Sequence, residues 1–157
     1  MRGIFSVLVE NKAGVLSQIS GLFARRGFNI DSLAVGETEN PEISNMTIVS
    51  TGDERTVDQV EKNLNKKLDV IKVRRLEESE SICLEMLLIK VAYTSKTRRD
   101  IMDICAVNGA NIIYMSAKNM IIELHETSDK IVNFIDFMRS FGIQEVQRTG
   151  TVAVTKG

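Results

Sequence analysis

The segment of this sequence best suited to bind a small molecule is the turn at residues 11–16, which joins an alternating apolar run to a helical one. The first turn of a helix has amide groups without intrahelical partners and a partial positive charge, which suit a carboxylate. Gly14 has no Cβ, so a ligand can come close to the backbone. Asn11 can accept a hydrogen bond from an ammonium group or donate one to a carboxylate.

Apolar side chains flank this turn. Val15, Leu16 and Ile30 are suited to enclose a small aliphatic side chain. Together with the anion site and the polar partner, they provide what an aliphatic α-amino acid needs. The competing interpretation is purely structural, because many helices begin with Asn or Gly for capping alone.

Asn29 is a second candidate ligand contact. It follows Gly27, and Asn111 follows Gly109 in the same way, so a repeated turn device is one interpretation. The other is that the second strand lies at a sheet edge. A second copy of the chain, paired edge to edge, would then carry Asn29 toward its partner's first helix.

Residues typical of enzyme active sites do not form a recognisable set. His125 is the only histidine, and we expect it to be a core or edge-strand residue. No Walker A, GxGxxG, HExxH or nucleophile-elbow pattern occurs. Cys83 and Cys105 lie in apolar runs without a metal-like spacing, which favours free core thiols. We therefore expect no catalytic residue and no metal site.

Composition favours a soluble cytoplasmic protein. Apolar residues make up 43% and charged residues 26% of 157 residues, and the formal net charge is −1. Such a balance provides no electrostatic attraction to nucleic acid or an anionic membrane. The N-terminal segment lacks the apolar core of a signal peptide, and no stretch is long and apolar enough to span a membrane.

The periodicity of apolar residues predicts a repeated β-α-β-β-α-β order. In the first half the expected strands are 2–10, 29–38, 43–51 and 70–76; the first helix is 14–26, and the second begins near Asp53 or Thr56 with an apolar stripe ending at Leu68. In the second half the expected strands are 84–92, 111–117, 120–125 and 143–151, with helices at 97–108 and 128–140.

This order is typical of two tandem ferredoxin-like domains of the α+β class. We expect an N-terminal domain at residues 1–76, a linker at 77–83 and a C-terminal domain at 84–157. Each half is so small that burial alone leaves its stability marginal. Exposed sheet edges invite pairing with a second copy, so we expect a homodimer.

Several motifs resemble the small, regulatory subunit of acetolactate synthase (acetohydroxyacid synthase), a family with ACT domains. The motifs are Val9 to Leu16, Gly21 to Leu33, Met46 to Val49, Val60 to Lys66 and Arg148 to Gly150. The resemblance implies an N-terminal ACT domain, a C-terminal ACT-like domain and a homodimer. It also implies a catalytic partner subunit, which would hold thiamine diphosphate, Mg and FAD, whereas this chain would hold no cofactor.

The resemblance further implies feedback control of branched-chain amino-acid synthesis. Valine or a related end product, such as isoleucine, would bind between two N-terminal domains. The implied contacts are Asn11, Ala13, Gly14, Val15 and Leu16 of one protomer, with Asn29 and Ile30 of the other. The alternative function is a tandem ACT amino-acid sensor that acts on a different protein partner.

Overall fold

The structure is a computed structural model that describes residues 2–157. The chain forms two compact units, and each is described by itself. The first contains residues 2–83 together with 151–157, and the second contains residues 84–150. Both have the predicted β-α-β-β-α-β order, which confirms the α+β class and the two ferredoxin-like repeats.

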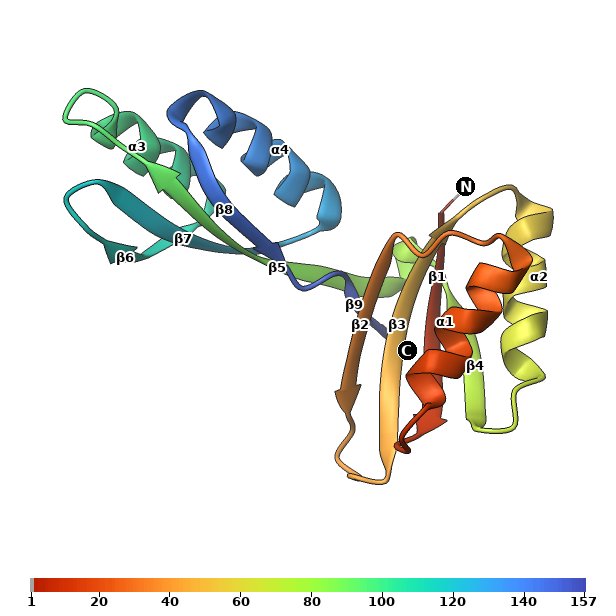
Figure 1. Cartoon of the computed structure of the whole chain (residues 1–157). Coiled ribbons are helices and arrows are strands. Elements are labelled where there is room, and N and C mark those ends of the chain that lie inside the picture. The colour runs from red at the N-terminus through yellow and green to blue at the C-terminus, as the bar shows by residue number, and fades with distance from the viewer. Residues whose placement is uncertain (1) are drawn as a thin grey trace. The chain divides into compact units, whose positions relative to one another are not determined.

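The first unit is a four-stranded antiparallel sheet with two helices on one face (Figure 1). Its elements are β1 (Arg2–Glu10), α1 (Val15–Arg26), β2 (Ser32–Glu37), β3 (Ile43–Thr51), α2 (Glu54–Asn65) and β4 (Val70–Leu76). The strand order β2-β3-β1-β4 places β2 at an edge, as predicted. Alternate residues of β1, namely Phe5, Val7 and Val9, pack into the helix-covered core.

The helix ends follow from local sequence. Gly14 precedes α1 and Gly27 follows it, with φ values of 90° and 69° that suit glycine. Asp53 caps α2 by accepting a hydrogen bond from the Thr56 amide at 2.7 Å. The predicted apolar stripe of α2 is wrong at its last member, because the helix ends at Asn65 and leaves Leu68 97% exposed.

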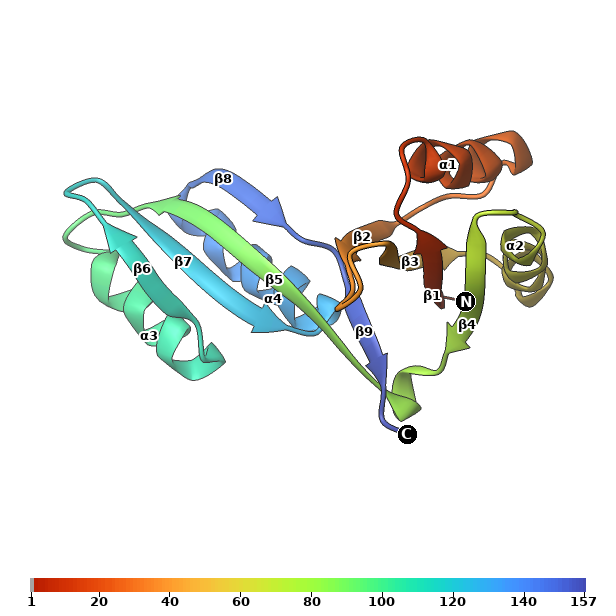
Figure 2. The ribbon, with the colours of Figure 1, turned by 90° about the horizontal axis from the view of Figure 1, so that it is seen from below.

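The second unit repeats the arrangement with a shorter hairpin. Its elements are β5 (Ser81–Ala92), α3 (Arg98–Asn108), β6 (Asn111–Met115), β7 (Asn119–Glu126), α4 (Ser128–Met138), the 3-10 turn Arg139–Phe141 and β8 (Ile143–Arg148). The strand order is β6-β7-β5-β8. Ile131, Phe134 and Met138 of α4 are fully buried, as their helical spacing predicts. Figures 1 and 2 show α3 and α4 on one face of this sheet.

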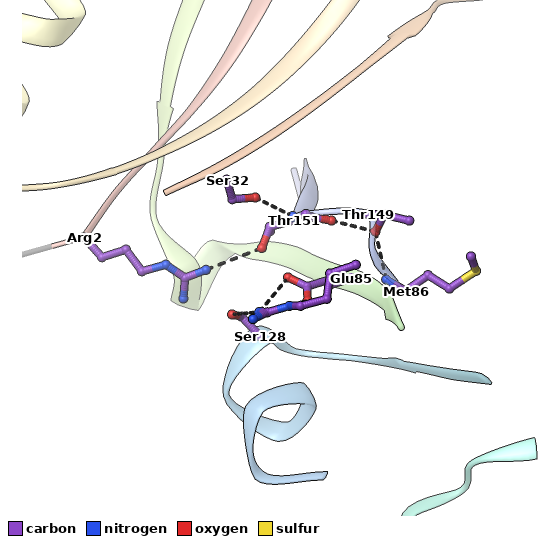
Figure 3. A network of polar contacts seen from close by, with 9 residues as sticks. Arg2, Ser32, Glu85, Met86, Ser128, Thr149 and Thr151 are labelled. Carbon is purple, nitrogen blue, oxygen red and sulfur yellow. Dashed lines mark hydrogen bonds and ion pairs between the residues drawn. The ribbon is translucent and has the colours of Figure 1, made fainter. Parts of the chain in front are cut away.

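The closing segment differs from the expected single strand at residues 143–151. Strand β8 ends at Arg148, Gly150 takes a φ of 80°, and a further strand, β9 (Val152–Thr155), pairs with β5. The Thr151 amide donates to the Ser32 hydroxyl at 2.8 Å (Figure 3). Residues 151–157 thereby return to the first unit.

This return changes the expected domain division. Ala153 is buried with Ile4, Val49 and Leu76 on the sheet face opposite the helices of the first unit. Residues 84–157 therefore do not form one compact unit, because the last seven complete the core of the other. The expected linker at 77–83 is partly regular, with a short 3-10 turn at Glu78–Glu80 and the start of β5 at Ser81.

Candidate functional site

The turn between β1 and α1 is fastened to the loop between β2 and β3. The backbone amide of Asn11 donates to the Glu42 carbonyl at 2.8 Å. Its side-chain nitrogen, Nδ2, donates to the Pro41 carbonyl at 2.8 Å and to Oε1 of Glu37 at 3.3 Å. Asn11 is therefore a fixed bridge between two segments that are about 30 residues apart in the sequence.

The start of α1 is open for a ligand. Gly14 is the N-cap residue and has no side chain to cap the first-turn amides. A Cβ built on Gly14 would have no atom within 4 Å outside its chain neighbours, so the space beside this residue is open. Ala13 is exposed and Leu16 is 46% exposed, whereas the Val15 side chain is buried in the core. Only the main chain of Val15 can therefore face this space.

The one lysine of the turn is already paired. Lys12 Nζ lies 2.7 Å from Oε2 of Glu10 and 3.9 Å from Oδ1 of Asp69. The hydrogen bond and charge of Glu10 raise the pKa of Lys12, and those of Lys12 lower the pKa of Glu10. Two carboxylates thus balance the lysine charge. A carboxylate at the start of α1 would have to rely on the main-chain amides and the helix dipole.

Asn29 and Ile30 lie at the opposite end of the sheet. The Asn29 carbonyl accepts a hydrogen bond from the Ser50 hydroxyl at 2.6 Å, and Ile30 packs against the core. Asn11, in contrast, is bonded to Glu42, which precedes β3 and lies eight residues before Ser50. At about 3.3 Å per residue of strand, Asn11 and Asn29 are therefore roughly 26 Å apart. One chain does not bring the predicted ligand contacts together.

The other candidate groups do not form a site. His125 is exposed near the end of β7, beyond Glu123, where the pairing with β6 ends, so it is not a core residue. Burial raises the pKa of the Cys105 thiol to about 11, and Cys83 is half-buried. Within residues 2–157, no three His, Cys, Asp or Glu side chains are grouped to hold a metal ion. None of the helices in that range is long and apolar enough to cross a membrane.

A groove of the first unit lies away from this turn. It has a volume of about 230 Å³ and lies on the sheet face opposite the helices. Its walls include Lys72, Arg74 and Thr155, and none of the seven predicted ligand contacts.

Comparison with known proteins agrees with this architecture. Residues 5–72 match the family of AHAS small subunit-like ACT domains, and residues 84–157 match the family described as the small subunit of acetolactate synthase. The fold and the glycine turn thus define a regulatory protein of the ACT class.

The individual relatives narrow this class. A probable acetolactate synthase small subunit of Archaeoglobus fulgidus is 46% identical and covers all of this chain and 98% of its own length. An acetolactate synthase small subunit of Haemophilus influenzae is 39% identical, with 100% and 97% covered. The crystal structure of the Thermotoga maritima small subunit superposes with a TM-score of 0.93 at 35% identity, covering 100% and 98%. The chain belongs to the acetolactate synthase small-subunit family.

Proposed function

We propose that this chain is the cytoplasmic, non-catalytic regulatory subunit of an acetolactate synthase. It binds valine or a related branched-chain amino acid between two N-terminal units, activates a catalytic subunit and makes that subunit subject to feedback inhibition. Thiamine diphosphate, Mg and FAD belong to the catalytic partner in this proposal. The observation that carries it is the open start of α1 at Gly14, fastened by Asn11 to the end of the edge strand β2.

The edge strand provides a route to a complete site. Strand β2 has β3 on one side and is unpaired on the other within residues 2–157, and Val35 is 46% exposed. Two β2 strands related by a two-fold axis would pair antiparallel. The start of one β2 would then lie against the end of the other.

This pairing supports the sharing of contacts between protomers. Asn29 precedes the start of β2, and Asn11 is bonded to Glu37 at its end. Antiparallel pairing would bring Asn29 and Ile30 of one protomer toward Asn11 and Gly14 of the other. Asn29 and Asn11 are roughly 26 Å apart within one chain, whereas Asn29 of one protomer would lie close to Asn11 of the other.

The chemistry of the turn suits a zwitterion with a short aliphatic side chain. The amides that begin α1 favour a carboxylate, and the exposed Leu16 offers an apolar surface. Regulation of the partner would follow if the ligand binds the two states of the assembly with different affinity, a coupling typically worth about 1–3 kcal/mol.

Calorimetry and affinity purification test the proposal. The full chain is titrated with valine, isoleucine and leucine, and a tagged chain is used to recover its partner. We expect heat with at least one of the three and recovery of a thiamine-diphosphate-dependent subunit. Absence of heat with every aliphatic amino acid would exclude the ligand site. Recovery of a different regulator in place of that subunit would favour an ACT sensor with another partner.

A further inference from the structure

The Asn11 side chain has one polar atom left for a ligand. Its backbone amide and its Nδ2 group donate to three acceptors, namely the carbonyl oxygens of Glu42 and Pro41 and the carboxylate of Glu37. Both groups facing Nδ2 are acceptors, which sets the orientation of the side-chain amide. Among residues 2–157 the Oδ1 atom has no hydrogen-bond partner. The Asn11 side chain therefore has an acceptor, and not a donor, available for a ligand.

Glu37 helps the Pro41 carbonyl to fix this orientation, and it adds charge of its own. Its carboxylate lies 3.3 Å from Asn11 Nδ2 at the end of the edge strand. A free carboxylate oxygen and Asn11 Oδ1 together make this side of the turn negative. Lys12, the lysine of the turn, is paired with Glu10 and Asp69 and does not offset that charge. The start of α1, at Val15, is positive.

We propose that Glu37 is a positioning and specificity residue that makes the turn selective for ligands with an ammonium group. The proposal rests on the function proposed above and extends it. The amides at Gly14 take the carboxylate, and Asn11 Oδ1, held by Glu37, takes the ammonium group. A 2-oxo or deaminated acid of the same shape would place no positive charge there. The subunit would thus distinguish an amino acid from its 2-oxo precursor.

The test compares two ligands that differ by the ammonium group, valine and 3-methylbutanoate, on the full chain by calorimetry. Glu37→Gln removes the charge and retains an acceptor, and Glu37→Ala removes both. Glu39→Gln is the matched control, because Glu39 is exposed two residues further along, in the loop after β2, and is not a hydrogen-bond partner of the Asn11 side chain. We expect Glu37→Gln to weaken valine binding about 10-fold and Glu37→Ala to weaken it more, with Glu39→Gln neutral. We expect the unmodified chain to bind 3-methylbutanoate far more weakly than valine.

The outcomes separate this inference from the function on which it rests. If the unmodified chain binds no aliphatic amino acid, the proposed function fails. If it binds valine and Glu37→Gln binds valine equally well, the role of Glu37 is overturned. Wild-type binding of 3-methylbutanoate as tight as that of valine would also overturn it, whereas binding too weak to measure is the discrimination we expect.

Discussion

Arg148 holds the carboxylate of Glu85 with two hydrogen bonds inside the second unit. Nε lies 2.6 Å from Oε2 and Nη2 lies 3.2 Å from Oε1. Nη2 also donates to the Ser128 hydroxyl at 3.3 Å, which joins strand β8 to the start of α4. The Glu85 side chain is 2% exposed, so its charge is satisfied almost entirely by this arginine.

Removal of this arginine should destabilise the second unit. In Arg148→Ala the Glu85 carboxylate would remain buried without its cation, so we expect a loss of about 2–3 kcal/mol in the free energy of unfolding. Urea unfolding followed by circular dichroism measures the change. Lys90→Ala is the control, since the pair of Lys90 with Glu145 joins the same two strands at the surface and should cost less than about 1 kcal/mol. Equal losses in both variants would contradict the expectation.

The return of residues 151–157 to the first unit can be tested on one strand. Ala153→Asp would place a carboxylate among Ile4, Val49 and Leu76, and we expect a loss of about 2–4 kcal/mol. Val154→Asp introduces the same charge one residue later at a position that is 70% exposed, and should change stability by less than about 1 kcal/mol. The measurement is again urea unfolding. A tolerated Ala153→Asp would show that β9 does not complete this core.

Gly14→Asp should abolish feedback inhibition and leave activation of the catalytic subunit intact. The added carboxylate would repel a bound carboxylate and fill the open space beside Gly14. Because Gly14 has a φ of 90°, any side chain adds strain of about 1–2 kcal/mol. Gly14→Ala carries the strain without the charge and should retain measurable inhibition. The activity of the reconstituted holoenzyme is measured with and without valine. If valine inhibits the Gly14→Asp holoenzyme as strongly as wild type, Gly14 is not part of the ligand site.

Stability should fall in alkali because of Cys105. Burial raises the pKa of this thiol to about 11, above its ordinary value near 9. Between these pH values the unfolded chain loses the thiol proton and the folded chain keeps it. The free energy of unfolding therefore falls as pH rises through this window, by at most about 1.4 kcal/mol per pH unit.

Two cysteine variants isolate this contribution. Urea unfolding at several pH values from 8 to 11 measures the free energy of unfolding, which should fall less steeply with pH for Cys105→Ala than for wild type. Cys83→Ala retains Cys105, so its free energy of unfolding should fall nearly as steeply as that of wild type. Parallel curves for wild type and Cys105→Ala would contradict the assignment.

Local patterns determined the regular elements well. Strands β1 and β4 have the bounds that alternation predicts, and Gly27 and Gly109 end helices where left-handed glycines are expected. These features depend on neighbours a few residues apart, which a sequence displays directly. The edge position of β2 also followed, because the β-α-β-β-α-β order admits few strand arrangements. The motifs at residues 9–16, 21–33, 46–49, 60–66 and 148–150 were specific enough in combination to indicate the family.

Long-range contacts could not be derived in this way. Nothing near Ala153 in the sequence indicates that it packs on Ile4, or that residues 151–157 leave the second unit. The orientation of Asn11 depends on Glu37 and Pro41, and the burial of Val15 depends on the whole core. In each case the stabilising contacts join groups that are far apart in the sequence and that only the folded chain brings together. A pattern of neighbouring residues therefore cannot predict them.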